Sequence, residues 1–157
     1  MEPLVAAFDG QFRRLNQRSE GFIVNVPDEL LYERPLAVGD DVIKLTIGEN
    51  LLRSVAMIEM AFGGITARMW DDPFEWTLPE ELNSTARIID YLNDVESTRQ
   101  RAFSSFRSDA DLARNIPAPR QLKTIAEILL ETIALAEHYQ GRAIAIFQSL
   151  GGGRFSR

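Results

Sequence analysis

Apolar residues recur at the helical period along four long stretches of the chain. Their spacing predicts helices over about 3–24, 46–68, 84–106 and 124–150, because an apolar residue every three or four positions lines one face of a helix. No stretch shows the alternation of apolar and polar residues that is typical of a half-buried strand. The pattern therefore predicts an all-α chain.

Local signals mark where several of these helices begin and end. Thr46–Glu49 and Thr124–Glu127 have the capping-box pattern, in which a threonine hydroxyl accepts from a free backbone N–H and a glutamate three residues later reaches back. Pro27 ends the first helix, and residues 27–31 have the composition of a single helical turn. Gly151 follows the last helix, where glycine commonly stops one.

Four helices of this length predict a four-helix bundle, with residues 1–150 as one domain and 151–157 as a flexible tail. The longer connections follow the first and third helices, which favours a bundle other than a simple up-and-down series. Pro117 and Pro119 predict an extended linker after the third helix, since residues before proline avoid the helical region.

Two glycines and three aromatic residues near the end of the second helix call for a structural or a binding role. Gly63 and Gly64 indicate either the close approach of another helix or a bend. Trp70, Phe74 and Trp76 follow in a loop. They line a pocket, form a dimer contact, or pin the loop to the end of the bundle.

Composition excludes several classes of function. The 157 residues carry a formal net charge of −6, and the 17 lysines and arginines are spread out, which argues against nucleic acid and anionic membranes as partners. The chain has no cysteine, so disulfides, thiolate metal sites and cysteine nucleophiles are excluded. The N-terminal stretch does not have the features of a signal peptide, and no apolar run reaches the length of a membrane span. We therefore expect a cytoplasmic protein.

Three patches, taken in order, resemble motifs of one protein family. They are Asp28–Pro35 (DELLYERP), Thr46–Val55 (TIGENLLRSV) followed by Glu59, and Glu137–Ile144 (EHYQGRAI) followed by Leu150-Gly151. Together they resemble the DinB/YfiT-like family of four-helix bundles, over nearly the whole chain. This resemblance implies a metal cleft at one end of the bundle, built from one histidine of the second helix and two histidines of the last. It also implies relatives that are thiol-dependent S-transferases and isomerases.

The chain departs from this family at every implied metal ligand. The family-equivalent positions are predicted to hold Ser54, Leu135 and Tyr139. Leucine has no donor atom, and neutral serine and tyrosine hydroxyls are poor ligands for a divalent metal. We therefore expect no metal of the family type and no cofactor.

The sequence also contains candidates for other kinds of site. Glu127, Glu131 and the only histidine, His138, lie along one flank of the last helix. They form either a solvated acidic surface or, with Glu49 or Glu59 from the second helix, a carboxylate metal site. Ser54 as a nucleophile with His138 as its base is a further alternative, without a supporting motif.

Three functions remain open. In the first, the chain binds a small molecule or a partner at the former metal cleft without metal, and the contact candidates are Asn50, Ser54, Leu135, His138 and Tyr139. The second is a metal-dependent thiol S-transferase-like enzyme with non-standard ligands. The third is a homodimeric interaction protein, since members of the family often dimerise. Because the metal ligands of the family are missing, the sequence favours the first or the third function over the enzyme.

Overall fold

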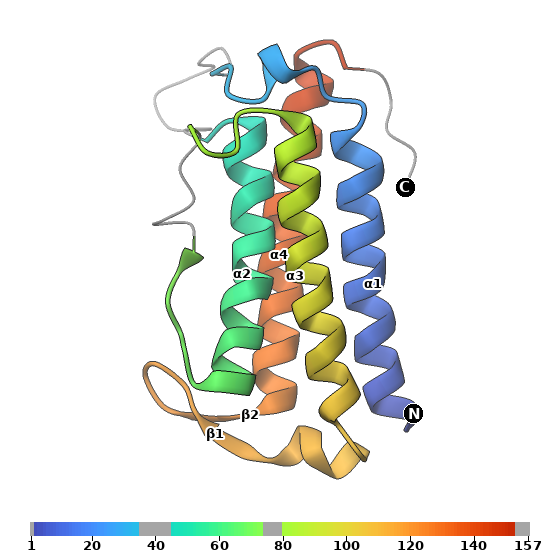
Figure 1. Ribbon diagram of the computed structural model, residues 1–157, viewed down its shortest axis with the longest axis vertical. Coiled ribbons are helices and arrows are strands. Elements are labelled where there is room, and N and C mark those ends of the chain that lie inside the picture. The colour runs from blue at the N-terminus through green and yellow to red at the C-terminus, as the bar shows by residue number, and fades with distance from the viewer. Residues whose placement is uncertain (1, 35–44, 74–79, 153–157) are drawn as a thin grey trace.

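In the computed structural model the chain forms a four-helix bundle with a small two-stranded sheet at one end (Figure 1). Residues 2–34, 45–73 and 80–152 are described. The four helices are α1 (Pro3–Ile23), α2 (Ile47–Ala67), α3 (Thr85–Ser105) and α4 (Ile125–Ser149). Among the described residues, no helix is long and apolar enough to cross a membrane.

The order of the helices in space differs from an up-and-down series, as the sequence predicted. Helices α2 and α3 run in the same direction, and α1 and α4 run against them (Figure 1). Helix α1 ends at the end of the bundle where α2 begins, and α3 ends where α4 begins. The chain after α2 instead starts at the end that holds the small sheet, and residues 80–84 precede α3 at the other end.

The predicted helix boundaries agree with the structure to within a residue or two. Both capping boxes are present, at Thr46 with Glu49 and at Thr124 with Glu127. The predicted turn near Pro27 is the short 3₁₀-helix η1 (Asp28–Leu30), and Gly151 takes a left-handed φ of 85° after α4.

The connection before α4 contains regular structure that the sequence pattern did not predict. The expected extended linker instead holds the 3₁₀-helix η3 (Asp109–Ala113), followed by strands β1 (Asn115–Pro117) and β2 (Leu122–Thr124). The strands pair antiparallel, with Ile116 opposite Lys123. Three residues are too few to show the alternation of apolar and polar positions by which a strand is recognised. The sequence pattern therefore missed these two strands. Asp109 also accepts hydrogen bonds from the N–H groups of Leu4 and Val5, which caps α1.

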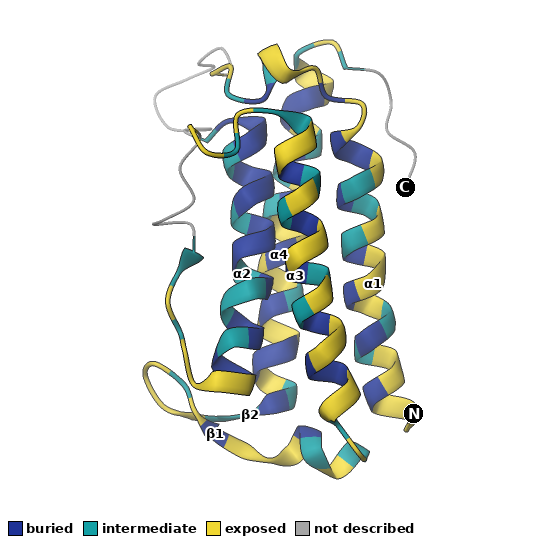
Figure 2. Cartoon of the chain, viewed as in Figure 1, coloured by how far each residue is buried: buried dark blue, intermediate teal, exposed yellow. Residues whose placement is uncertain are grey.

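The apolar faces of the helices meet in one core (Figure 2). Its centre is a cluster of three phenylalanine rings, from α1, α2 and α3, whose centroids lie 5.1 to 5.9 Å apart: Phe12, Phe62 and Phe103. Phe12 and Phe62 meet edge-on and the other two pairs are tilted, and ring contacts of this kind add to the stability gained from burial.

A charged cluster is buried beside this core, between α1 and α3. Arg99 is only 2% exposed, and its guanidinium pairs with Asp9 of α1 and, at 2.6 Å, with Glu96 of α3. Burial alone would lower the pKa of Arg99, but the hydrogen bonds to Glu96 and Asp9 outweigh it and raise that pKa. Arg99 therefore stays charged. Arg13 also pairs with Asp9, at 2.5 Å, so the cluster contains two cations and two carboxylates.

The Gly63-Gly64 pair allows the loop after α2 to pack closely against that helix. A Cβ atom on Gly64 would lie 2.3 Å from a ring carbon of Trp70. The indole Nε1 of Trp70 donates to the carbonyl of Pro117 at 3.1 Å. The loop is thus pinned between α2 and the small sheet, while Phe74 and Trp76 lie outside the described residues.

We expect Arg99→Ala to lower the free energy of unfolding by about 3–5 kcal/mol, because it removes the buried cation of Asp9 and leaves that carboxylate only its pair with the exposed Arg13. Urea unfolding followed by circular dichroism measures this. The double variant Asp9→Leu with Arg99→Met removes both charges and should recover most of the loss. Arg101→Ala, an exposed arginine of the same helix, is the control. A loss for Arg99→Ala no larger than for Arg101→Ala would contradict this account.

Gly64→Ala should destabilise the protein by about 1–3 kcal/mol, since the added methyl group displaces the Trp70 ring. It should also change the tryptophan fluorescence. Gly10→Ala is the matched control, because a Cβ atom there meets nothing within 4 Å. That change should stabilise the protein by about 0.5–1 kcal/mol through helix propensity. If both variants were equally stable, the contact of Trp70 with Gly64 would not matter.

Candidate functional site

Helices α2 and α4 pack side by side in opposite directions and carry all five predicted contact residues (Figure 1). Asn50 and Ser54 lie on α2, and Leu135, His138 and Tyr139 lie on α4. The structure buries the two α2 residues and leaves the three α4 residues wholly or partly exposed. The five side chains therefore do not surround one common cavity.

Ser54 joins the two helices. It is 1% exposed, and its hydroxyl donates to the main-chain carbonyl of Ala136 on α4 at 2.8 Å. A hydroxyl bonded in this way inside a helix interface is neither a metal ligand nor an activated nucleophile. His138 lies exposed on α4, so the structure does not form the pair of Ser54 with His138.

Asn50 makes side-chain hydrogen bonds to the main chain at the start of α2. It is fully buried, and its Nδ2 donates to the carbonyls of Thr46 at 2.9 Å and Leu45 at 3.3 Å. Its Oδ1 is buried and has no hydrogen-bond partner among the described residues. Asn50 is thus part of the helix start rather than of an open surface.

The α2 residue that faces Tyr139 is Arg53. The central carbon of its guanidinium lies 5.9 Å from the centroid of the Tyr139 ring, within the range of a cation–π contact. The ring of His138 meets Tyr139 edge-on, with centroids 5.4 Å apart. Neighbouring residues of a helix point about 100° apart, so Ser54 faces the core and Arg53 faces outward. Sequence reasoning missed Arg53 because a shift of one residue separates these two faces.

Leu135 lies one helical turn from Tyr139 and borders a small hollow of about 120 Å³. Met57 of α2, one turn from Arg53, lines the same hollow, and Trp70 is part of its wall. Leu135 is 45% exposed, so part of its apolar surface faces this hollow and solvent. We call the surface along the contact of α2 with α4, from Arg53 and Tyr139 to the hollow lined by Met57 and Leu135, the α2–α4 groove. Lys123 and Glu131 also line that hollow.

The residues at the family-equivalent positions do not fit a metal ion. Leu135 offers no donor atom, the hydroxyl of Ser54 is used within the helix interface, and the neighbour of Tyr139 is a cation. Positive charge beside a ligand opposes the binding of a second cation.

The acidic flank of α4 does not form a metal site either. Glu127 caps its own helix, where hydrogen bonds from the backbone N–H and then the hydroxyl of Thr124 lower the pKa of its carboxyl. Glu131 pairs with Lys123 at 2.5 Å. Within the described ranges, no three histidine, aspartate or glutamate side chains lie close enough together to hold a metal ion.

Two of the motifs that carry the family resemblance meet at one end of the bundle. The N–H of Gly48 donates to the carbonyl of Leu31 at 2.6 Å, and a Cβ atom there would lie 2.6 Å from the ring of Tyr32. The hydroxyl of Tyr32 donates to the carbonyl of Leu82 at 2.6 Å. Burial, followed by the charge of Glu49, raises the pKa of Tyr32 to about 12. The glycine of this motif thus serves packing rather than chemistry.

The third motif contributes buried hydrogen bonds that connect α4 to α1. Gln140 is fully buried, and its amide donates to the carbonyl of Leu15 at 2.9 Å and to the hydroxyl of Ser19 at 2.6 Å. Arg18 donates to the side-chain oxygen of Gln140 and to Glu137. Gln140 lies on the buried face of α4 together with Ala136 and Ala143, and a polar residue at such a position is the signal in the sequence that could have revealed this contact.

Comparisons with known proteins agree with this architecture. No family model matches the sequence, and no curated protein matches it either. Among solved structures, a DinB-like protein from Bacillus cereus superposes with a TM-score of 0.75, covering 96% of this chain and 95% of that one at 18% sequence identity. The chain therefore has the fold of DinB-like proteins, a four-helix bundle, as the sequence motifs predicted.

Proposed function

We propose that this protein binds a small organic anion with an apolar body in the groove between α2 and α4, without a metal ion. One observation carries the proposal: the guanidinium of Arg53 lies over the ring of Tyr139, at a position where the family resemblance implies a metal ligand. Arg53 then supplies positive charge at this end of the groove, and Lys123, which is paired with Glu131, lines the hollow at its other end.

The chemistry of Arg53 suits this role. A guanidinium stays charged at all physiological pH values and presents its donors in a planar fork that matches a carboxylate. Arg53 and Tyr139 are both half-buried, which weakens the screening of their charges by water. The Tyr139 ring also restricts the guanidinium, so less conformational freedom is lost when an anion binds.

The apolar part of the ligand would follow the groove toward the small sheet. Met57 and Leu135 lie one helical turn, about 5.4 Å, beyond Arg53 and Tyr139 on their respective helices. Both line the 120 Å³ hollow in front of Trp70. An apolar chain lying there would cover the exposed surface of Leu135, which favours binding through the hydrophobic effect.

This arrangement favours binding over catalysis. The hydroxyl of Ser54 is bonded to a main-chain carbonyl, and His138 contacts Tyr139 by its ring. No observation favours the metal-dependent transferase. Homodimerisation stays a prediction. The exposed Leu130 and Leu135 on α4 are compatible with it, and light scattering tests it.

We expect wild-type protein to bind octanoate, and Arg53→Gln to weaken that binding by at least about tenfold, or about 1.4 kcal/mol. Isothermal titration calorimetry at low and high salt measures the affinity, which should fall as salt rises. Neutral 1-octanol should bind both proteins equally, because it reports only the apolar part of the groove.

Arg14→Gln is the control for this experiment, since it removes one exposed arginine of α1. It should leave octanoate binding within about twofold of wild type. Equal affinity of octanoate for wild type and Arg53→Gln, or no binding at millimolar concentration, would rule out the proposed site.

Purified protein should retain no stoichiometric zinc, nickel or iron after dialysis, because the groove lacks a set of donor atoms. Elemental analysis by mass spectrometry measures the metal content. One ion per chain that survives dialysis would instead support the metal-dependent transferase.

Designed variants provide a positive control for this measurement. Arg53→His combined with Leu135→His and Tyr139→His places three imidazoles on the outer faces of α2 and α4. We expect that triple variant to gain zinc. The same triple with Ser54→His in place of Arg53→His should not, since Ser54 points into the helix interface.

A further inference from the structure

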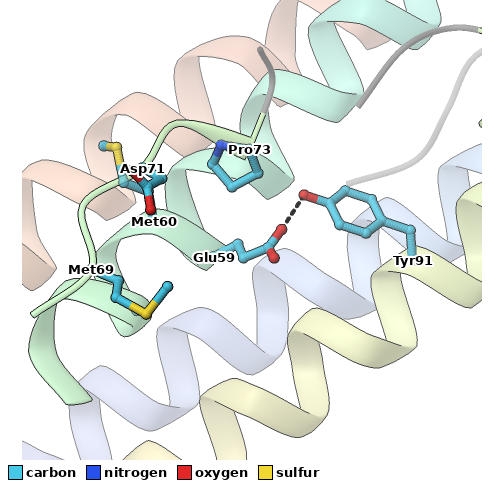
Figure 3. A pocket seen from close by; sticks show the side chains of 7 residues that line it. Glu59, Met60, Met69, Asp71, Pro73 and Tyr91 are labelled. Carbon is cyan, nitrogen blue, oxygen red and sulfur yellow. Dashed lines mark hydrogen bonds between the residues drawn. The ribbon is translucent and has the colours of Figure 1, made fainter. Parts of the chain in front are cut away.

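A larger hollow lies on the other side of α2, between α2, α3 and the segment that follows α2 (Figure 3). Its volume is about 520 Å³, within the range of roughly 300–1,000 Å³ that small-molecule sites occupy. The described residues that line it come from three parts of the chain: Glu59, Met60 and Gly63 of α2, Tyr91 of α3, and Met69, Asp71 and Pro73 of the segment.

The charged side chains among the described residues that line this hollow all have one sign. Glu59 and Asp71 carry carboxylates, and no lysine, arginine or histidine is among the described residues that line the hollow. The hydroxyl of Tyr91 donates to one oxygen of Glu59 at 2.5 Å, and Figure 3 shows Glu59 turned toward Tyr91. This hydrogen bond orients the carboxylate and leaves its remaining lone pairs able to accept from a ligand.

The rest of the lining is apolar or aromatic. Met60 and Met69 offer flexible, polarisable thioethers that adapt to ligands of different shape. Pro73 lines the hollow on the side of the segment that follows α2, and the Tyr91 ring is a face on which a cation can rest. Two carboxylates in such walls suit a singly charged organic group better than a metal ion, which needs more oxygen ligands.

We propose that this hollow binds a small organic cation, an ammonium group on an apolar body. Glu59 and Asp71 hold the charge, and the two methionines with Pro73 cover the apolar part. The site is separate from the α2–α4 groove and takes a ligand of opposite charge. Met60 lines both hollows.

The test compares two probes of the same size, 2-phenylethylamine, which is an ammonium ion at pH 7, and the neutral 2-phenylethanol. Affinities are measured by isothermal titration calorimetry on the full chain, with nuclear magnetic resonance to locate the perturbed residues. We expect the amine to bind at least about tenfold more tightly than the alcohol, and its affinity to fall as salt rises.

Two variants remove the charges while keeping the side-chain shapes. Glu59→Gln and Asp71→Asn should each weaken amine binding by about fivefold or more and leave alcohol binding unchanged. Asp71 is exposed in a loop, so Asp71→Asn keeps the test valid even if Glu59→Gln disturbs the fold. Asp90→Asn, an exposed carboxylate next to Tyr91 that is not among the lining residues, should change amine binding by less than about twofold.

Three results would overturn the proposal. Equal binding of amine and alcohol would mean that the hollow recognises apolar surface alone. No binding of the amine at millimolar concentration would mean that it is not a site for cations of this class. Displacement of the amine by micromolar calcium or zinc would mean that the carboxylates serve a metal ion.

Discussion

The close packing of α2 against α4 is the constraint on which the rest of the structure depends. Small side chains at the interface allow it, and the hydrogen bond from Ser54 to the carbonyl of Ala136 shows how near the two backbones come. That bond fixes the rotation of α2 about its axis. Once Ser54 faces α4, Arg53 and Met57 must lie at the outer edge of the interface, beside Tyr139 and Leu135. The polar and apolar ends of the groove both follow from this one rotation.

Buried polar groups fix the other pairs of helices in the same way. Arg99 with Asp9 joins α3 to α1, and Gln140 with Ser19 joins α4 to α1. Apolar contacts such as those among the phenylalanine rings tolerate small shifts, whereas a buried charge or amide tolerates none without losing its partner. The bundle therefore combines an adaptable apolar core with a few buried polar contacts that favour one arrangement of the helices. The recessed surfaces on either side of α2 are consequences of that selected arrangement.

Local signals were enough to predict the helices and the family fold. Threonine and glutamate at capping positions and glycine after α4 act within one turn, so their effect can be read without tertiary structure. The short strands β1 and β2 could not be predicted, because their pairing depends on how the connection folds back against α4. The contact of Gly64 with Trp70 could not be predicted either, because it depends on how the loop after α2 folds back against that helix.

The candidate site was harder to predict than the fold for a geometric reason. A shift of one residue on a helix changes direction by about 100°, so alignment to a motif without its histidines could not separate Ser54 from Arg53. The hollow between α2 and α3 depends on Asp71 and Tyr91, which are distant in sequence and belong to no motif. Asp9 and Arg99, by contrast, occupy core-facing positions of their helices. Charged residues there were a signal that periodicity alone could have revealed.

A crystal structure of the protein with 8-bromooctanoate tests the central claim most directly, because the anomalous signal of bromine locates the end of the ligand. The account predicts a carboxylate within about 3 Å of the Arg53 guanidinium. It also predicts bromine near Met57 and Leu135, with no metal peak beside Tyr139. A metal ion coordinated at Tyr139, or bromine found only away from the α2–α4 groove, would contradict it.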